Sequence, residues 1–346
     1  MGVGDNRDPM SPLLSPSGHN PWRLSVAPMM DWTDRHCRWL HRQLTRYTRL
    51  YTEMVTTGAL LHGDVARHLR FDPIEHPVAL QLGGNEPRAL ALAARMGEVW
   101  GYDEINLNCG CPSPRVQRGA FGACLMEHPK LVADCVRAMR DAVRVPVTVK
   151  HRIGIDRVED YGFVRDFVGT VAEAGCEVFI VHARNAWLDG LSPAENRTVP
   201  PLRYAVVYRL KQDFPHLTIV INGGITTDAQ LAEHLRHVDG VMVGREAYHN
   251  PWWLALWDAT YFGDGTAAPP DRDAVEARMV EYMAREGPSL PGGWYAIARH
   301  MLGLRHGQPG ARRWRQVWSD HRYKHRPVHE VAARAQAALR GEALPA

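Results

Sequence analysis

The residues best suited to chemistry stand together in residues 104–114, which read Glu-Ile-Asn-Leu-Asn-Cys-Gly-Cys-Pro-Ser-Pro. The stretch begins with the alternation of a strand and then breaks into Gly and Pro, which do not continue a strand. Cys111 is therefore expected on a loop at a strand exit, where reactive side chains are commonly placed. The alternative is a small buried hydrophobic residue. A zinc site needs about four ligands, and the six cysteines form no second cluster.

The elements around this motif alternate between short apolar runs and amphipathic stretches of helical period. The apolar runs predict strands at residues 23–26, 50–52, 78–82, 104–107, 147–150, 178–182, 218–221 and 240–243. The amphipathic stretches predict helices at 87–100, 129–143, 161–174, 201–213 and 229–235. This order favours an α/β fold of the (β/α)8 TIM barrel type. An open doubly wound sheet is the alternative, but no Gly-x-Gly-x-x-Gly follows the first strand.

The domain organisation follows from where these patterns begin and end. Residues 1–20 have no periodicity and are expected to form a flexible lead-in. The barrel is expected at residues 21–262, followed by a linker. Residues 271–340 have a helical pattern with glycine-containing breaks and predict a small C-terminal helical domain.

Residues able to bind a ligand stand at nearly every predicted strand exit. Each has an ordinary explanation when taken alone, but the carboxyl ends of barrel strands share one face, and that face carries the active site of such enzymes. The residues at these exits are Pro28, Met29 and Met30 after the first strand, Glu53 and Met54 after the second, Gln81, Asn108 with Cys111, Lys150, His182, Asn222 with Gly223 and Gly224, and Gly244 with Arg245.

The last two strand exits indicate a phosphate site, because barrel enzymes often bind phosphate there. Gly223, Gly224 and Gly244 can present backbone N–H groups to an anion. Arg245 can add a bidentate guanidinium fork. These residues predict a phosphorylated cofactor, whose ring the other strand ends would hold.

Asn-Leu-Asn-Cys-Gly-Cys-Pro, followed by the glycine-rich residues 118–123, closely resembles the catalytic loop of the tRNA-dihydrouridine synthases. The resemblance covers roughly residues 22–330. It implies an NAD(P)H-dependent flavin oxidoreductase that reduces uridine to 5,6-dihydrouridine in tRNA. Three further segments, at 187–197, 300–304 and 309–315, resemble the A-type bacterial synthases and imply U20/U20a of the D-loop as the target.

The resemblance also implies roles for individual residues. Hydride would pass from reduced FMN to C6 of uracil, and Cys111 would give a proton to C5 from the opposite face. NADPH is the implied reductant, and no dinucleotide fingerprint is present for it. The residues implied to hold FMN are Pro28, Met29, Met30, Gln81, Lys150, His182, Asn222, Gly223, Gly224, Gly244 and Arg245.

Basic and aromatic residues are interleaved in residues 299–326, a composition suited to phosphate contacts and base stacking. Trp314 and Trp318 are instead expected in the core of the helical domain. Arg312 and Arg315 stand three residues apart, hence on one helix face. By analogy with the A-type synthases, the residues expected to contact tRNA are Asn108, Arg197, Arg312 and Arg315.

Composition sets few limits on function. The net charge of +3 neither requires nor excludes nucleic acid. No secretory signal or membrane-spanning apolar run is visible, so a cytoplasmic protein without a bound metal or a membrane anchor is expected. Two alternatives remain. One is an FMN-dependent barrel reductase of a small enoate or pyrimidine, and the other is a non-catalytic RNA-binding protein.

Overall fold

The computed structural model describes residues 18, 20–265 and 268–342. Nearly all of the expected lead-in therefore lies outside the described residues. The eight parallel strands pair in the order β1-β8-β7-β6-β5-β4-β3-β2, which confirms the predicted barrel. They are β1 (Leu24–Val26), β2 (Leu50–Thr56), β3 (Val78–Gly83), β4 (Glu104–Cys109), β5 (Val147–Arg152), β6 (Val178–His182), β7 (Thr218–Asn222) and β8 (Gly240–Val243).

β1 and β2 close the barrel through a short contact. The N–H of Val26 donates to the carbonyl of Arg49 at 3.0 Å, and the N–H of Arg49 donates to that of Leu24 at 3.1 Å. The predicted end of the second strand was wrong. β2 continues to Thr56, so Glu53 and Met54 lie inside the strand rather than after it. An irregularity in the β2–β3 register between Tyr51 and Met54 accompanies this extension.

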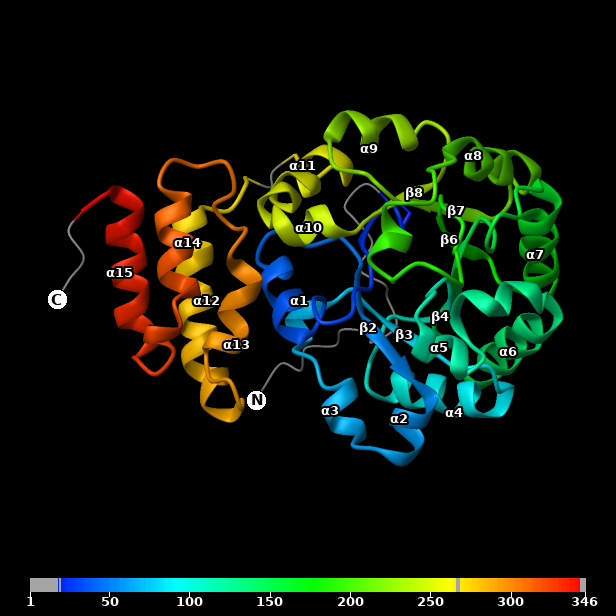
Figure 1. The fold of residues 1–346 in the computed structure, drawn as a ribbon, viewed down its shortest axis with the longest axis horizontal. Helices are drawn as coiled ribbons and strands as arrows, with labels where there is room; N and C mark the ends of the chain where they lie inside the picture. Colours follow the sequence, from blue (N-terminus) through cyan, green and yellow to red (C-terminus); the bar gives the residue numbers. More distant parts are fainter. Residues whose placement is uncertain (1–17, 19, 266–267, 343–346) are drawn as a thin grey trace, which may run out of the picture.

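Helices surround the barrel (Figure 1). Polar caps and prolines start several of them: Asp34 caps α1, and Pro87 and Pro129 begin α4 and α6. The helices of this part are α1 (Arg35–Arg42), α2 (Thr57–His62), α3 (Val65–Leu69), α4 (Pro87–Val99), α5 (Pro114–Arg118), α6 (Pro129–Ala142), α7 (Tyr161–Glu173), α8 (Tyr204–Asp213), α9 (Asp228–His234), α10 (Arg245–His249) and α11 (Trp257–Tyr261). The 3₁₀ helices of this part are Pro73–Glu75, Gly122–Glu127, Glu195–Arg197 and Pro251–Leu256. α8 begins three residues later than the predicted start at 201, because the N–H of Arg203 still bonds the carbonyl of Ala183 after β6.

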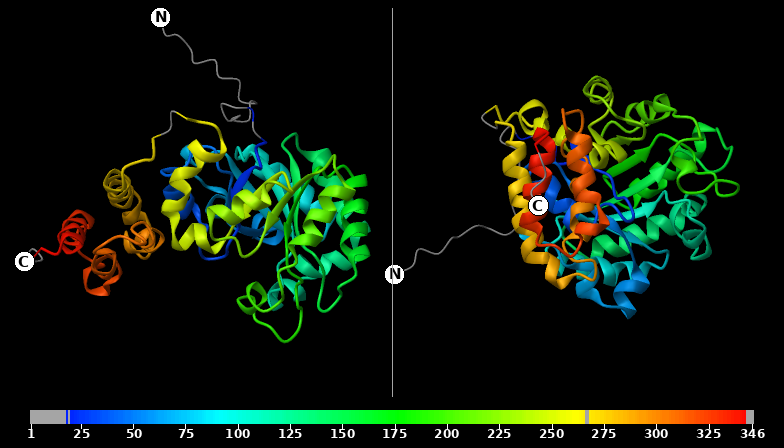
Figure 2. Two further views of the ribbon diagram at one scale, coloured as in Figure 1. Left: turned by 90° about the horizontal axis from the view of Figure 1, so that it is seen from above. Right: turned by 60° about the vertical axis from the view of Figure 1, so that its left-hand side comes forward.

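The C-terminal helices form a separate body beside the barrel (Figure 2). They are α12 (Arg272–Glu286), α13 (Tyr295–Ala298), α14 (Ala311–Ser319) and α15 (Val328–Arg340), with 3₁₀ helices at Gly287–Ser289, Arg299–Met301 and His321–Tyr323. Trp314 and Trp318 are buried, as predicted, and both indole N–H groups donate to the carboxylate of Glu276. Arg305 also bonds Glu276 and is 4% exposed, so its inclusion in a surface for RNA phosphates was wrong.

The helical body is docked on α1 of the barrel. Tyr282 stacks on Trp39 with ring centroids 4.2 Å apart. Asp34, which caps α1, accepts hydrogen bonds from Arg299 at 2.9 Å and from His300 at 3.0 Å. The contact therefore joins the C-terminal body to the loop that follows β1, where Pro28–Met30 stand.

Candidate active site

Strand register brings most of the predicted site residues to one end of the barrel. Asn108 on β4 is the strand partner of Lys150 on β5. Arg152, also on β5, is paired with His182 on β6, and His182 is paired with Asn222 on β7. Since parallel strands all end at the same face, the loops that carry Cys111, Gly223 and Arg245 open onto the same mouth.

The loop that carries Cys111 is anchored to the strand it leaves. The side-chain oxygen of Asn108 accepts the backbone N–H groups of Gly110 at 3.1 Å and Cys111 at 3.0 Å. Burial raises the pKa of the Cys111 thiol above its usual value, although a backbone amide and three nearby cations act in the opposite direction. Cys111 therefore keeps its proton at neutral pH and can donate it.

The charged neighbours that act on Lys150 and His182 are mostly other cations. Burial, with repulsion by Arg152, lowers the pKa of Lys150 to about 7, and the Cys111 sulfur acts in the opposite direction. Burial also holds the pKa of His182 well below its usual value, and Arg152 and Lys150 act in the same direction. A mouth built in this way disfavours further positive charge and favours an anion.

The loops after β7 and β8 leave room for such an anion close to the backbone. Gly223 has φ +122°, and a Cβ at this position would stand 2.8 Å from the His182 ring. Gly224 has φ +69°, another conformation that side chains rarely adopt. The exposed guanidinium of Arg245 lies beside this cradle and donates to the carbonyl of Arg197 at 3.3 Å. This cradle and the cations around it fit the phosphate and ring of a flavin mononucleotide.

The predicted RNA residues do not all share one place. Asn108 is 8% exposed and its side chain is engaged with the Cys111 loop and with Gln81. Arg197 is exposed on the loop after β6, at the barrel mouth. Arg312 and Arg315 are exposed on α14, in the other body. A ligand that contacts all of these regions must extend across both bodies.

Sequence reasoning missed two residues that fasten the mouth loops to one another. The Arg152 guanidinium donates to the carbonyls of Gly110 at 3.1 Å and Asn196 at 3.0 Å. The Gln117 side chain donates to the carbonyls of Pro112 and Leu188, both at 2.9 Å. Arg152 and Gln117 thus connect the loop that carries Cys111 to the loop after β6. The only sequence signal was the position of Arg152 two residues after Lys150, on the same face of β5.

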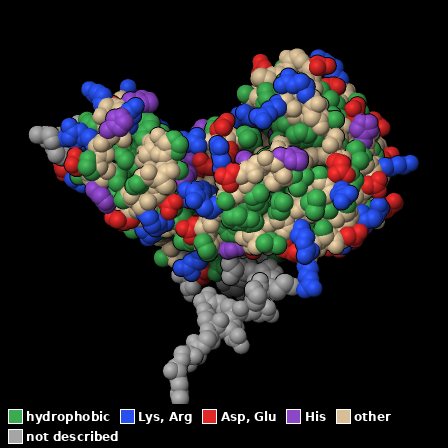
Figure 3. All heavy atoms as spheres, turned by 90° about the horizontal axis from the view of Figure 1, so that it is seen from below, with side chains coloured by type: hydrophobic (Ala, Val, Ile, Leu, Met, Phe, Trp, Pro, Cys, Tyr) green, Lys and Arg blue, Asp and Glu red, His purple; other side chains and the backbone are tan. Residues whose placement is uncertain are grey.

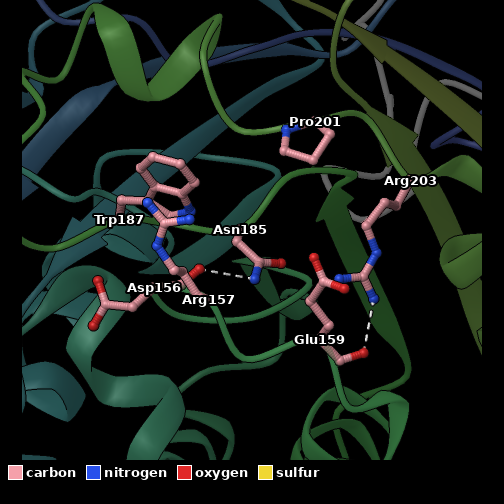
Figure 4. Close-up of a pocket in the computed structure, with 7 residues that line it drawn as sticks. All are labelled: Asp156, Arg157, Glu159, Asn185, Trp187, Pro201 and Arg203. Atoms are coloured by element: carbon pink, nitrogen blue, oxygen red, sulfur yellow. Dashed lines mark hydrogen bonds between the residues drawn. The ribbon is translucent and has the colours of Figure 1, made fainter.

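A cavity of about 290 Å³ lies between the loops that follow β5 and β6, and Figure 4 shows its lining residues. The guanidinium of Arg157 lies over the Trp187 ring, with 4.7 Å between Cζ and the ring centroid. None of the predicted site residues lines this cavity. The lining residues are Asp156, Arg157, Glu159, Asn185, Trp187, Pro201 and Arg203.

No helix within residues 18, 20–265 and 268–342 is long and apolar enough to cross a membrane. In the same described residues, no group of three or more His, Cys, Asp or Glu side chains is placed to hold a metal ion.

Known proteins are similar in sequence to this chain over nearly its whole length. Proteins named tRNA-dihydrouridine(20/20a) synthase are similar in sequence. That of Salmonella typhimurium is 58% identical over 319 residues, 91% of this chain and 94% of its own length. That of Pseudomonas aeruginosa is 60% identical over 297 residues, 86% of this chain and 89% of its own. That of Escherichia coli K12 is 58% identical over 309 residues, 88% of each chain.

A likeness to a solved structure concerns the fold alone. A 2-naphthoyl-CoA reductase in complex with 2-naphthoyl-CoA matches 68% of this chain and 49% of its own, with a TM-score of 0.51 and 11% sequence identity.

The dihydrouridine synthase family model matches residues 25–340. With that match and the identities above, the chain belongs to the dihydrouridine synthase family.

Proposed function

We propose that this protein reduces uridine to 5,6-dihydrouridine in the D-loop of tRNA, at U20 and U20a. FMN is the bound cofactor and NADPH the reductant in this proposal. Its main support is the placement of a protonated thiol, Cys111, on a loop held beside Lys150 in a cation-rich mouth. The names of the similar synthases supply the substrate.

The site residues divide the work of holding FMN. The glycine cradle at Gly223 and Gly224 and the guanidinium of Arg245 would take the phosphate. Lys150 would place its charge beside the ring edge that becomes negative on reduction. Gln81, His182 and the Pro28–Met30 segment would contact the rest of the ring, and Met30 is 56% exposed at this position.

The chain's own part in the reaction is to orient uracil and supply a proton. Bound FMN would supply the hydride for C6 of the ring. Cys111 then gives its thiol proton to C5, and the raised pKa keeps that proton available. The target base must leave its stack to enter the mouth, which costs least in an RNA loop.

Two surfaces would hold the tRNA. Figure 3 shows a notch between the helical body and the barrel, with Lys and Arg side chains near both of its walls. Arg197 stands on the barrel side at the mouth, and Arg312 and Arg315 on the helical body. In this proposal, residues 21–262 form the catalytic domain and residues 271–340 bind tRNA. The proposed tRNA substrate is consistent with the expected cytoplasmic location.

An absorption experiment tests this proposal. The purified protein should show a flavin band that bleaches under anaerobic NADPH and returns when tRNA lacking dihydrouridine is added. Nucleoside analysis of that tRNA should then show dihydrouridine at U20 and U20a. A bleached flavin that leaves tRNA unchanged would favour the small-molecule reductase. Failure to bind FMN even on reconstitution would favour the RNA-binding alternative.

A further inference from the structure

The inner face of β4 is a column of polar side chains. Glu104, Asn106 and Asn108 alternate with apolar residues along the strand, and all three are buried, from 0% to 8% exposed. Alternation places them on the same side, toward the barrel interior. Asn106 is the strand partner of Gln81 on β3 and of Thr148 on β5. A layer of polar groups thus crosses three strands below the mouth.

These side chains form one continuous hydrogen-bonded chain. Thr148 Oγ1 bonds Glu104 Oε1 at 2.5 Å, and Asn106 bonds Thr148 at 2.8 Å. Asn106 also bonds Gln81 at 2.8 Å, and Gln81 bonds Asn108 at 2.9 Å. The chain ends at the backbone of the loop that carries Cys111. We call these five side chains the polar relay.

The carboxylate end of the polar relay fixes the direction of every bond. Glu104 is paired with Arg49 at 3.2 Å and also accepts the indole N–H of Trp22, so its oxygens act as acceptors. Thr148 must then give its single hydrogen to Glu104, which leaves its oxygen to accept from Asn106. The same direction then applies to the amides of Asn106, Gln81 and Asn108. Each amide points its nitrogen toward the Glu104 end and its oxygen toward the loop, because the reverse orientation would set two donors or two acceptors against each other.

The loop end requires the same direction independently. The backbone N–H groups of Gly110 and Cys111 can only donate, so the atom of Asn108 that faces them must be its oxygen. Asn108 nitrogen then faces Gln81 oxygen, and Gln81 nitrogen faces Asn106 oxygen. Both ends of the polar relay therefore demand one arrangement. One N–H of Gln81 remains for an acceptor outside the relay.

We propose that the polar relay positions both the Cys111 loop and the Gln81 amide for uridine reduction. Glu104, Thr148 and Asn106 are thereby positioning residues that touch neither substrate nor cofactor. This inference rests on the proposed function for its catalytic meaning. The geometry of the loop itself depends only on the protein.

The sharpest test compares two substitutions of one residue. Thr148→Val keeps shape and strand preference but removes the hydroxyl, whereas Thr148→Ser keeps the hydroxyl in a residue less suited to strands. Without the hydroxyl, Asn106 loses its acceptor, and the three amides are held only from the loop end, which leaves Asn108 less firmly oriented toward the Gly110 and Cys111 amides. Thr148→Val should speed hydrogen exchange of the Gly110 and Cys111 amides about tenfold, the order of one buried hydrogen bond. Thr148→Ser should leave the exchange near the wild-type rate.

Tyr51 offers a matched control, because its hydroxyl donates to the same Glu104 oxygen at 2.8 Å but lies outside the polar relay. Tyr51→Phe should therefore leave exchange at the Cys111 loop unchanged. In turnover, Thr148→Val should lower kcat about tenfold with KM for tRNA unchanged, since one buried hydrogen bond is removed and the arginines proposed to hold tRNA, Arg197, Arg312 and Arg315, are kept. If Thr148→Val does not accumulate as folded protein, Thr148→Ala removes the same hydroxyl.

Three results would overturn the polar relay. Unchanged exchange in Thr148→Val is one, equal acceleration in Thr148→Ser is another, and equal acceleration in Tyr51→Phe is the third. Because the exchange is measured on the protein without FMN or tRNA, it reports on the relay even if uridine is not the substrate. An inactive wild-type protein would count against the proposed function alone.

Discussion

Lys150 on β5 reaches past β6 to Asn222 on β7, and its ammonium donates to the Asn222 side-chain oxygen at 3.2 Å. Asn222 in turn donates to the carbonyl of Met242 on β8 at 2.7 Å. A buried amine is thus held in the mouth by a neutral amide. The charge of Lys150 remains uncompensated by this partner and available to an anion.

Lys150 should make FMN binding depend on pH. Its pKa of about 7 means that the protein without cofactor loses this charge as pH rises. An anion bound beside Lys150 would raise that pKa, so the amine takes up a proton when the anion binds. Above about pH 7.5 the FMN phosphate is already doubly charged, so only the protein titrates. FMN affinity, measured by flavin fluorescence quenching, should there fall by up to about tenfold per pH unit.

Lys150→Met should bind FMN more weakly and lose this pH dependence. Lys130→Met, which alters an exposed lysine on α6, should keep the wild-type dependence. An equal slope in wild type and Lys150→Met would show that another group carries the titration.

Cys111→Ala should bind FMN normally and be reduced by NADPH, because the thiol is not part of the phosphate cradle. Dihydrouridine formation should slow by about 100-fold or more, the usual contribution of a general acid. Stopped-flow reoxidation of the reduced flavin by tRNA measures this step. Cys124→Ala removes another partly exposed thiol and should react like wild type. Normal turnover by Cys111→Ala would remove its assignment as proton donor.

The α14 arginines should bind phosphates of the RNA backbone. In the double variant Arg312→Ala with Arg315→Ala, tRNA binding should weaken, and the slope of log K against log salt should become shallower by up to about 0.7–0.9 for each phosphate that the protein no longer neutralises. Filter binding over a range of salt concentrations measures both effects. Arg313→Ala is the control, because Arg313 bonds the carbonyl of Ala338 at 2.8 Å and should affect stability instead. An unchanged salt slope in the double variant would place the RNA elsewhere.

The Asp34 contact should stabilise the docked arrangement of the two bodies. Burial would raise the pKa of Asp34, but hydrogen bonding and charge from His300 outweigh it and hold the pKa well below its usual range. A lowered carboxyl pKa stabilises the fold above the unfolded value of about 3.9 and loses that effect as pH falls below it. Asp34→Asn should therefore lower the free energy of unfolding by about 1–3 kcal/mol at pH 7.

This difference from wild type should shrink as pH falls below about 4, because the carboxyl group then takes up a proton in the unfolded chain while the folded protein still holds it charged. Urea unfolding at several pH values measures it. Asp271→Asn is the matched control, since Asp271 caps α12 and Asn serves equally well at such positions. If Asp34→Asn lowers the free energy of unfolding no more than Asp271→Asn does, Asp34 acts only as a helix cap.

Much of the barrel was predictable because its strands are buried on both faces. Runs such as residues 178–182 and 240–243 are almost wholly apolar, and the regular return of such runs fixes the fold class. The location of the predicted site follows from the same rule, since parallel strands end together. This is why Lys150, His182 and Asn222, far apart in sequence, could be assigned to one face before the structure was known.

Other features depend on partners that local sequence does not reveal. In the sequence, Arg305 looks like part of a basic surface. In the structure it is buried and pairs with Glu276, which stands 29 residues earlier in the chain. Asp34 caps α1, and only the docking of residues 299–300 gives it a second role. The polar relay needs strand register as well as alternation, because Gln81 and Thr148 meet Asn106 across strands.

The most direct test of the central claim is a single turnover with an unlabelled tRNA transcript that contains no modified bases. Protein reconstituted with FMN, reduced by NADPH and freed of excess reductant would be mixed anaerobically with the transcript, and each uridine then analysed by mass spectrometry. We predict that U20 and U20a gain the mass of two hydrogen atoms as the flavin reoxidises, and that Cys111→Ala greatly slows both changes. Reoxidation without any mass change in the tRNA, or no reoxidation at all, would contradict uridine reduction by this protein.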